Sequence, residues 1–417
     1  MAPGWLIIAD DLTGAADCAV AFAKRRLTAR VVWGDYLDTI LEPPLALAID
    51  SGSRVLDAPA AYAKHAELLR QHRSEGVRVF KKIDSTLRGN PADEIAGLLD
   101  VMRAQSPDTR LVVAPAFPAT GRVTRGARVH VHGVPLEFTE FWPSGADPAR
   151  ADVVQLLETV GIPAVSVPLE KIRSRGFELP PGPKAVVCDA ETESDLDVIA
   201  AACVGPHPVL LVGSAGLAHS IARRISPEAG LRARPIQVSP TRHGALIVAG
   251  SQAQATRVAL HELESLSGIE RLTLTAHSVE QPQNTTEAIE ARLELLQAIA
   301  DGKDLVVDFV LPESARHMTP TQIQELAGRL ARRVIPFAAQ ASALVATGGE
   351  TAATLFARLG ITGIQLVDEI EDGIALGLTL GSLSIPVVTK AGGFGDAGCL
   401  RRIVERLRFI RGNGTVA

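Results

Sequence analysis

The feature that most constrains the fold is a regular alternation of short apolar runs with longer alanine- and leucine-rich stretches. In the first half of the chain, the runs typical of buried strands are residues 5–9, 29–33, 45–49, 77–81, 111–114, 185–188 and 209–212. Helical patterns lie between or after them, at residues 15–26, 58–75 and 217–224. Apolar strands that alternate with helices predict a largely parallel sheet with helices on both faces.

This alternation is interrupted once, at residues 226–243, a stretch rich in proline, arginine and polar residues that fits a linker. A second series of apolar runs follows at residues 245–249, 272–275, 304–309, 343–347, 363–366 and 386–389. A chain of 417 residues is also long for a single core. We therefore predict two α/β domains with largely parallel sheets covered by helices, at residues 1–234 and 235–417. The tail after Ile410 is expected to fray.

The composition argues against several classes of protein. Aromatic residues make up only 4% of the chain, the net charge is −5, and no basic block stands out, which disfavours a nucleic-acid surface. The cysteines Cys18, Cys188, Cys203 and Cys399 lack metal-ligand or redox spacing, as expected for a reduced, cytoplasmic chain. We find neither a signal peptide nor an apolar run of the roughly 18 residues that a membrane span needs.

Acids and hydroxyls follow the first predicted strand. Ligands of open α/β sheets bind beyond the carboxyl ends of the strands, which is where Asp10 and Asp11 lie. Thr13 and Gly14 are placed to open the next helix, whose N-terminus favours anions. The alternative is that Asp11 or Thr13 only caps that helix.

A second set of polar residues follows the strand at residues 77–81. Arg88 can bind a carboxylate through two hydrogen bonds, and Lys82 can act as a point charge. Asp84, with Asp10 and Asp11, can accept hydrogen bonds from hydroxyl groups, and one of these carboxylates could take a proton from an attacking hydroxyl. Ser85 completes the set, and a solvated loop is the alternative. A third junction, residues 114–122, is rigid and ends in another cation, or its prolines only shape a turn.

The two histidines of the HxH pair are not predicted to bind a metal. His130 and His132 would share one face of a strand, but no third ligand lies near them in the sequence. We interpret both as ordinary surface histidines and assign no metal ligand.

Glycine-rich loops follow three strands of the second half, at residues 250–252, 347–352 and 390–396. Glycine lets backbone N–H groups approach phosphate oxygens closely. The chain has no Walker motif, and no GxGxxG fingerprint follows the first predicted strand, which disfavours a dinucleotide oxidoreductase. Together the two halves predict a polyhydroxy acid and a phosphorylated ligand that meet in an interdomain cleft, where Mg²⁺ bridges phosphates during phosphoryl transfer.

Six collinear motifs resemble those of the four-carbon acid sugar kinases, a family long known only as a domain of unknown function. They are ADDLTGAAD (residues 9–17), KKIDSTLRGN (81–90), APAFPATGR (114–122), AGSQ (249–252), TGGET (347–351) and KAGGFGD (390–396). The resemblance spans essentially the whole chain. It implies an ATP-dependent kinase that phosphorylates the terminal (C4) hydroxyl of a four-carbon sugar acid, with ATP and Mg²⁺ as cofactors and no nucleic-acid or membrane partner; a homodimer is left open.

The resemblance also implies roles for particular residues. The N-terminal domain would bind the sugar acid through Asp10, Asp11, Lys82, Asp84, Ser85 and Arg88. The C-terminal domain would bind ATP through Ser251, Gly348, Gly349, Glu350 and Gly393. Asp84 and Asp396 are competing candidates for the catalytic base, and Asp396 is also a candidate for a contact with Mg²⁺ and phosphate.

The second motif bears on the substrate. Members that resemble 3-oxo-tetronate kinases carry a cysteine-containing variant there, whereas this chain has KKIDSTLRG, which is similar to the threonate and erythronate kinases. D-threonate or D-erythronate is therefore the expected substrate. A 3-oxo-tetronate kinase and a non-catalytic sensor of sugar acid and nucleotide remain alternatives.

Overall fold

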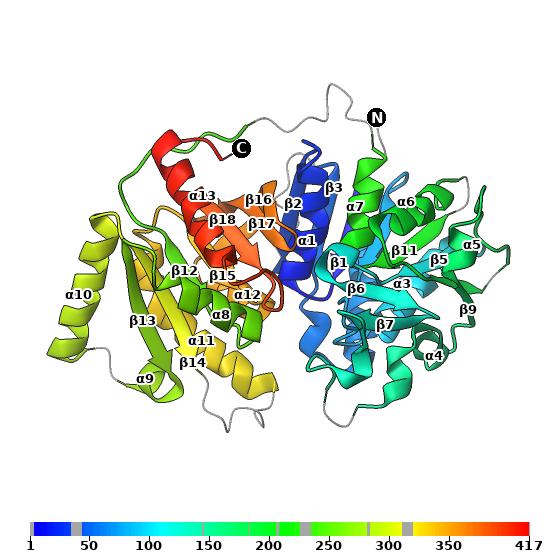
Figure 1. The fold of residues 1–417 in the computed structure, drawn as a ribbon, viewed down its shortest axis with the longest axis horizontal. Coiled ribbons are helices and arrows are strands. Elements are labelled where there is room, and N and C mark those ends of the chain that lie inside the picture. The colour runs from blue at the N-terminus through cyan, green and yellow to red at the C-terminus, as the bar shows by residue number, and fades with distance from the viewer. Residues whose placement is uncertain are drawn as a thin grey trace. The chain divides into compact units, whose positions relative to one another are not determined.

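The computed structural model describes residues 4–34, 44–143, 146–182, 184–205, 208–225, 235–281, 284–310 and 320–416. The chain divides into two compact units, Met1–Arg232 and Ala233–Ala417, coloured blue to green and green to red in Figure 1. Each unit is an α/β structure with a hydrophobic core of its own, as predicted. The predicted linker at residues 226–243 lies partly outside the described residues.

The sheet of the first unit has the strand order β2-β3-β1-β4-β11-β5-β10-β9, and all of its pairings are parallel. The strands are β1 (Trp5–Ala9), β2 (Ala29–Trp33), β3 (Ala46–Asp50), β4 (Arg78–Lys82), β5 (Arg110–Ala114), β9 (Ala164–Val167), β10 (Ala185–Cys188) and β11 (Val209–Gly213). Seven of these match predicted runs, and β9 is additional. β1 is buried along its whole length, as expected for a central strand with both faces covered.

Several helices of the first unit begin where a polar side chain caps them. They are α1 (Leu12–Ala23), α2 (Ala58–His72), α3 (Pro91–Gln105), α4 (Val153–Glu158), α5 (Leu169–Ile172), α6 (Glu193–Ala202) and α7 (Ala215–Arg223). Asp57 caps α2, and a capping box of Thr192 and Asp195 begins α6. A small antiparallel sheet of β6 (Arg122–Arg125), β7 (Arg128–Val131) and β8 (Val134–Pro135) was not predicted.

The strand order fixes where a ligand can bind in the first unit. The chain leaves β1 through α1 toward β2, and leaves β4 through α3 toward β5, on the other side of the sheet. β1 and β4 are neighbours, so the connections diverge from their carboxyl ends. In open α/β sheets such a switch point is where ligands bind. Both predicted acid-rich segments therefore begin at one crevice.

The second unit has the strand order β13-β14-β12-β15-β18-β17-β16. The strands are β12 (Leu246–Ala249), β13 (Ile269–Thr275), β14 (Asp304–Val310), β15 (Leu344–Thr347), β16 (Ile361–Glu371), β17 (Ile374–Gly381) and β18 (Pro386–Lys390). The first five in this order pair in parallel, whereas β16, β17 and β18 pair antiparallel. The run predicted at residues 363–366 is thus part of a long hairpin.

Helices cover this sheet as well. They are α8 (Gln254–Leu263), α9 (Ala276–Glu280), α10 (Thr286–Ala300), α11 (Pro320–Ala338), α12 (Gly349–Arg358) and α13 (Cys399–Asn413), as labelled in Figure 1. Of these, α8 and α13 bury apolar residues in one core. The predicted fraying after Ile410 is wrong: α13 continues to Asn413, and Val416 is buried and donates its N–H to Ile236. Within the described residues, no helix has the length and apolar character to cross a membrane.

The second unit has a switch point of its own. The chain leaves β12 through α8 toward β13, and leaves β15 through α12 toward β16, at the opposite side of the sheet. β12 and β15 are neighbours. The loops that follow them, which start at Gly250 and Gly348, therefore border the crevice where a ligand of this sheet is expected.

Candidate active site

Asp11 organises the start of α1 in the first unit. As the N-cap residue, it accepts a hydrogen bond from Gly14 N–H at Oδ1 (3.0 Å) and one from Thr13 Oγ1 at Oδ2 (2.7 Å). Gly14 must be small, because a Cβ there would lie 2.6 Å from Asp11 Oδ1 and 2.8 Å from Lys82 Nζ. The helix start is therefore packed directly against the second predicted segment.

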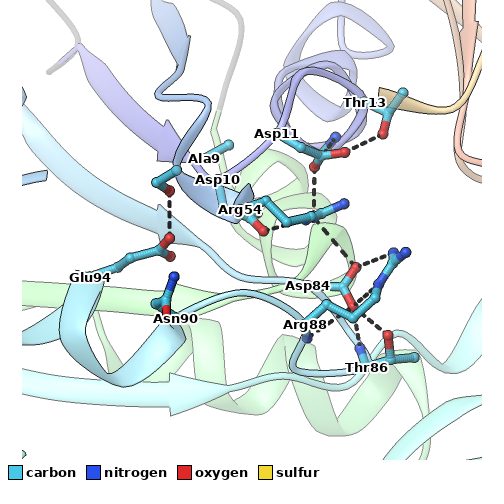
Figure 2. Close-up of polar contacts among 12 residues, drawn as sticks. Ala9, Asp10, Asp11, Thr13, Arg54, Asp84, Thr86, Arg88, Asn90 and Glu94 are labelled. Carbon is cyan, nitrogen blue, oxygen red and sulfur yellow. Dashed lines mark hydrogen bonds and ion pairs between the residues drawn. The ribbon is translucent and has the colours of Figure 1, made fainter. Parts of the chain in front are cut away.

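Arg54 joins the two predicted segments. It lies in a short 3₁₀ turn (Ser53–Val55) after β3 and reaches three carboxylates. Its Nε donates to Asp10 Oδ2 at 2.7 Å, and its Nη2 donates to Asp11 Oδ1 at 2.9 Å and lies 3.6 Å from Asp84 Oδ1. Figure 2 shows the guanidinium between these acids. The sequence analysis did not single out Arg54, although the run of polar residues after the strand at 45–49 offered the same signal as the other strand ends.

Asp84 holds the loop after β4 together. Its Oδ2 accepts hydrogen bonds from Thr86 N–H (3.1 Å), the Thr86 hydroxyl and Arg88 Nε (2.9 Å), and its Oδ1 accepts one from Arg88 Nη2 (2.7 Å). The Arg88 side chain is still 49% exposed, so one face of its guanidinium remains accessible to a ligand.

Two polar groups of the site have no direct partner in the described part of the chain, the ammonium of the largely buried Lys82 and the buried Asp10 Oδ1. Lys82 is 5% exposed, and within the described ranges its ammonium has neither a hydrogen bond nor an ion pair. The same part of the chain offers no hydrogen-bond donor to Asp10 Oδ1. Ser85 lies between Asp84 and Thr86 and is also buried. Because buried polar groups are normally paired, these atoms fit a ligand that supplies a carboxylate or phosphate oxygen to Lys82 and a hydroxyl to Asp10.

The charges of the site hold one another ionised. Burial alone would raise the pKa of Asp10 and Asp84, but Arg54 and Lys82 lower both, and Arg88 lowers that of Asp84 furthest. Burial opposes the charge of Lys82, yet Asp10 and its other neighbours raise its pKa. The site therefore keeps paired charges in a partly dry environment, where electrostatic interactions are strong.

Asp50 differs from these carboxylates, because its surroundings raise its pKa. It ends β3, pairs in register with Ala9 and accepts a hydrogen bond from Gly52 N–H at 2.8 Å. Burial and then the charge of Asp11 raise its pKa to about 7. The sequence did not distinguish Asp50 from the other strand-end acids, because its pKa depends on neighbours from another strand.

A buried ion pair supports the turn that carries Arg54. Lys81 Nζ lies 2.8 Å from Glu94 Oε2 and 2.9 Å from His65 Nε2, and all three residues are almost fully buried. The other oxygen of Glu94 accepts a hydrogen bond from Ser53 Oγ at 2.5 Å. Burial and Lys81 hold the pKa of His65 well below its usual value, so its ring stays neutral.

The third predicted junction also borders this site. Arg122 begins β6, is 4% exposed, and stacks its guanidinium over the Phe141 ring at 5.6 Å. Burial lowers the pKa of Arg122 to about 10, against the opposing charge of Asp84. Arg122 is therefore a further cation in the same electrostatic neighbourhood as Arg88.

The glycine loops of the second unit converge on Ser251. A Cβ at Gly392 would lie 2.1 Å from Ser251 Oγ, and one at Gly348 would lie 3.5 Å from Ser251 Cβ. Gly348 is the N-cap of α12, with φ of 89°, and Gly349 and Glu350 form its first turn. The structure thus brings Ser251, Gly348, Gly349 and Glu350 together at the N-terminus of a helix, a location that favours phosphate groups. Gly393 follows Gly392 in the third loop.

Asp396, the other candidate base, is far more exposed than the residues of this cluster. Its side chain is 71% exposed and accepts a hydrogen bond from Arg402 Nη2 at 2.7 Å, and this bond lowers its pKa. Neither His130 nor His132 is fully buried, and His130 Nδ1 lies 3.1 Å from Arg128 O.

Comparison with known proteins agrees with the division into two units. Residues 5–221 match the family model of a sugar-binding N-terminal domain, and residues 246–400 match that of a nucleotide-binding C-terminal domain. The D-threonate kinase of Cupriavidus necator is 34% identical over 95% of this chain and 96% of its own length. The D-erythronate kinase of Heliobacterium modesticaldum is 29% identical, over 94% and 95%.

The fold also recurs in solved structures. A Salmonella typhimurium protein, provisionally described as a tRNA synthase, superposes with a TM-score of 0.75 at 20% identity and covers 96% of this chain and 98% of its own. At that identity the likeness concerns the fold alone. The two matched domain models and the kinase relatives, aligned over nearly their whole lengths, place this chain in the four-carbon acid sugar kinase family.

Proposed function

We propose that this protein transfers the γ-phosphate of ATP to the terminal (C4) hydroxyl of D-threonate, with D-erythronate as the next candidate. The observation that carries the proposal is a pair of groups beside the β1–β4 switch point, the buried Asp10 Oδ1, which has no hydrogen-bond partner in the described part of the chain, and the ammonium of the largely buried Lys82. A four-carbon sugar acid offers what both lack, because it has one carboxylate and several hydroxyl groups.

In this proposal the first unit binds the acid. Lys82 attracts its carboxylate, and Arg88 contributes a guanidinium that is already oriented by Asp84. Asp10 accepts a hydrogen bond from a substrate hydroxyl, and Ser85 offers a further hydroxyl. Arg54 lowers the pKa of Asp10 and holds Asp10 and Asp11 in fixed positions.

The second unit binds the nucleotide in the same proposal. The N–H groups at the start of α12 and the glycine loop around Gly393 contact phosphate oxygens, and Ser251 adds a hydroxyl. Mg²⁺ in kinases neutralises the phosphates and keeps most of its ligands as phosphate oxygens and waters, so it needs few protein carboxylates. Glu350 in the first turn of α12, and the exposed Asp396, fit that limited donor set.

The chemical step forms a bond between the terminal oxygen of the acid and the γ-phosphorus, and breaks the bond from that phosphorus to the β–γ bridging oxygen. The hydroxyl proton leaves to a carboxylate or to solvent, and ADP departs. Such a step depends mainly on positioning and charge neutralisation. Asp84 and Asp396 are the candidate bases, and burial within the acid-binding group favours Asp84.

The relatives support this choice of substrate. The D-threonate kinases of Cupriavidus necator and Bordetella bronchiseptica are 34% and 31% identical to this chain. A 3-oxo-tetronate kinase of Methylobacterium radiotolerans is 28% identical.

The test is ADP release by the purified protein with Mg·ATP across D-threonate, D-erythronate, their L isomers and the 3-oxo-tetronates. We expect the highest kcat/KM with D-threonate or D-erythronate. If kcat/KM is highest with a 3-oxo-tetronate, that compound and not D-threonate is the substrate. If no four-carbon acid stimulates ADP release, the proposal is overturned. Binding of acid and nucleotide in calorimetry without ADP release would identify a sensor instead.

A further inference from the structure

Lys390 is a buried lysine that no assignment above uses. It ends β18, at the start of the third glycine loop, and its side chain is 0% exposed. Its ammonium donates to Thr256 Oγ1 at 3.2 Å and to the carbonyl oxygens of Ala391 and Gly392 at 3.3 and 3.5 Å. Across the described ranges it has no ion pair with a carboxylate.

The burial of the Lys390 ammonium destabilises the fold unless a negatively charged group compensates for it. Removing an ammonium from water without a carboxylate partner is unfavourable, and neutral carbonyl and hydroxyl oxygens compensate only in part. Burial lowers the pKa of Lys390, and the charges of Cys399 and Glu371 oppose this shift. Glu371 is itself paired with Arg402. The positive charge beneath the loop therefore lacks a counter-ion of its own.

The contacts of Lys390 orient the peptide groups of the loop. In a planar trans peptide, the C=O of one residue and the N–H of the next point in opposite directions. Since the carbonyls of Ala391 and Gly392 face Lys390, the N–H groups of Gly392 and Gly393 are directed to the other side of the loop. Thr256 reinforces this orientation, because its hydroxyl donates to Gly392 O at 2.9 Å.

Lys390 also connects the glycine loops to one another. Its own carbonyl accepts the N–H of Gly348, the N-cap of α12, at 2.9 Å. Thr256 belongs to α8, which follows the loop containing Ser251. Gly392 packs so closely on Ser251 that no side chain fits between them. One residue thus contacts or supports all three loops that the proposed function assigns to the nucleotide.

We infer that Lys390 is a positioning residue for the phosphate groups of the nucleotide, acting from behind the loops. It fixes the N–H groups of the third loop toward the phosphates and adds a buried positive charge for which the phosphates are the counter-ion. This inference rests on the proposed function, and it predicts an effect that grows with the number of phosphates.

The test measures binding of adenosine, AMP, ADP, ATP and D-threonate to the full-length protein by calorimetry, in the wild type and in Lys390→Met. Met has a similar length and no charge. We expect ATP affinity to fall at least about tenfold, the scale of one charge-assisted interaction. The loss should shrink from ATP to AMP and vanish for adenosine, and D-threonate affinity should not change.

Two further variants make the result interpretable. Thr256→Val keeps the charge and removes the hydroxyl that links Lys390 to Gly392, so it should give a smaller loss of the same kind, and it tests the inference even if Lys390→Met fails to fold. Lys303→Met removes an exposed lysine of the same unit that is paired with Glu270, and should leave every affinity unchanged.

The outcomes separate the inference from the proposed function. Equal losses for adenosine and ATP, or an unchanged ATP affinity in Lys390→Met, would overturn the inference and leave the kinase proposal standing. If the wild type binds no nucleotide at all, the nucleotide assignment fails and the inference fails with it.

Discussion

At the scale of single residues, the group proposed to bind the acid (Asp10, Asp11, Lys82, Asp84, Ser85 and Arg88, with Arg54) depends on contacts between segments that are distant in sequence. Arg54 follows β3, whereas its three carboxylate partners follow β1 and β4. Each carboxylate is held by at least one arginine, so the removal of one side chain changes the charge and position of the others. Effects of substitutions in this group will therefore not be additive.

The choice between the two candidate bases can be tested with Asp84→Asn and Asp396→Asn. Asn preserves the shape of the side chain and removes its basicity. We expect Asp84→Asn to lower kcat by at least about tenfold, within the range for acid–base groups. We expect a smaller loss of kcat from Asp396→Asn, because that carboxylate is 71% exposed and lies outside the group that contains Asp84.

Steady-state kinetics with the acid and ATP varied separately would decide between the candidates. A larger loss of kcat in Asp396→Asn would reverse the assignment. A higher KM for the acid with kcat unchanged in Asp84→Asn would mean that Asp84 only holds Arg88 and the loop in place.

Part of this site follows from the sequence alone. Asp10, Asp11, Lys82, Asp84 and Arg88 could be proposed together because each follows an apolar run, and the structure gathers them. Two properties could not be predicted from the sequence. The bridging position of Arg54 requires the strand order, and the titration of Asp50 requires knowing that it is buried next to Asp11.

The raised pKa of Asp50 predicts a pH-dependent stability. Its usual pKa is 3.8 and its folded-state value is about 7, so between these pH values the folded chain retains a proton that the unfolded chain releases. Stability from this group therefore falls as the pH rises from about 4 to 7. Asp50→Asn cannot ionise, so we expect it to raise the unfolding temperature relative to wild type by more at pH 8 than at pH 5.

Thermal unfolding followed by tryptophan fluorescence would measure this difference. Asp108→Asn, at an exposed position, controls for the loss of one negative charge. An equal shift at both pH values would show that Asp50 ionises normally in the folded protein.

At the scale of elements, alanine substitutions at two helical glycines should have different effects, one on substrate binding and the other on the stability of the fold. A Cβ at Gly14 would lie 2.6 Å from Asp11 Oδ1 and 2.8 Å from Lys82 Nζ, so these two side chains must move. A Cβ at Gly97 would lie 2.4 Å from the backbone oxygen of Tyr62, so α3 must move away from α2.

We expect Gly14→Ala to raise the KM for the acid about tenfold or more, since it displaces charged groups. The free energy of unfolding of this variant should change little, because the higher helix propensity of Ala over Gly, about 1 kcal/mol, offsets the cost of moving the Asp11 and Lys82 side chains. Gly97→Ala should lose about 1–3 kcal/mol of stability through overpacking and leave that KM unchanged. Steady-state kinetics and denaturant unfolding of both variants provide the measurement. A higher KM in Gly97→Ala with an unchanged KM in Gly14→Ala would contradict the proposed location of the acid site.

The elements that the sequence predicted well are the buried parallel strands, which appear as continuous apolar runs. The hairpin of β16 and β17 was missed because its strands carry charged and small residues along much of their length. A signal for it was present, since Asp372 and Gly373 form a two-residue Asp-Gly connection between paired strands, with Gly373 at φ of 81°. The small sheet of β6 to β8 was missed because β6 (RVTR) and β7 (RVHV) alternate polar and apolar residues and so give no continuous apolar run.

At the scale of the whole molecule, the proposal assigns each ligand to one unit. Hydrogen–deuterium exchange of the intact protein can test this with one ligand at a time. D-threonate alone should slow exchange at residues 10–17 and 82–90. A non-hydrolysable ATP analogue alone should slow it at residues 249–256, 347–352 and 390–395.

These patterns follow because bound ligands reduce the local opening that exchange requires. If the nucleotide analogue alone protected the first set, or D-threonate alone the second, the assignment of ligands to units would be wrong. A two-domain chain of this kind also need not unfold in one step, so exchange is more informative here than a single melting temperature.

The location of the tryptophans gives the protein an intrinsic optical probe. All three, Trp5, Trp33 and Trp142, belong to the first unit, and Trp33 pairs in register with Asp50 at the carboxyl edge of the sheet. Emission excited at tryptophan therefore reports on the acid-binding half alone, while the nucleotide-binding half contributes no tryptophan signal. A titration with sugar acid can be followed without a label, and an emission change on adding nucleotide would be a direct sign that the second unit communicates with the first.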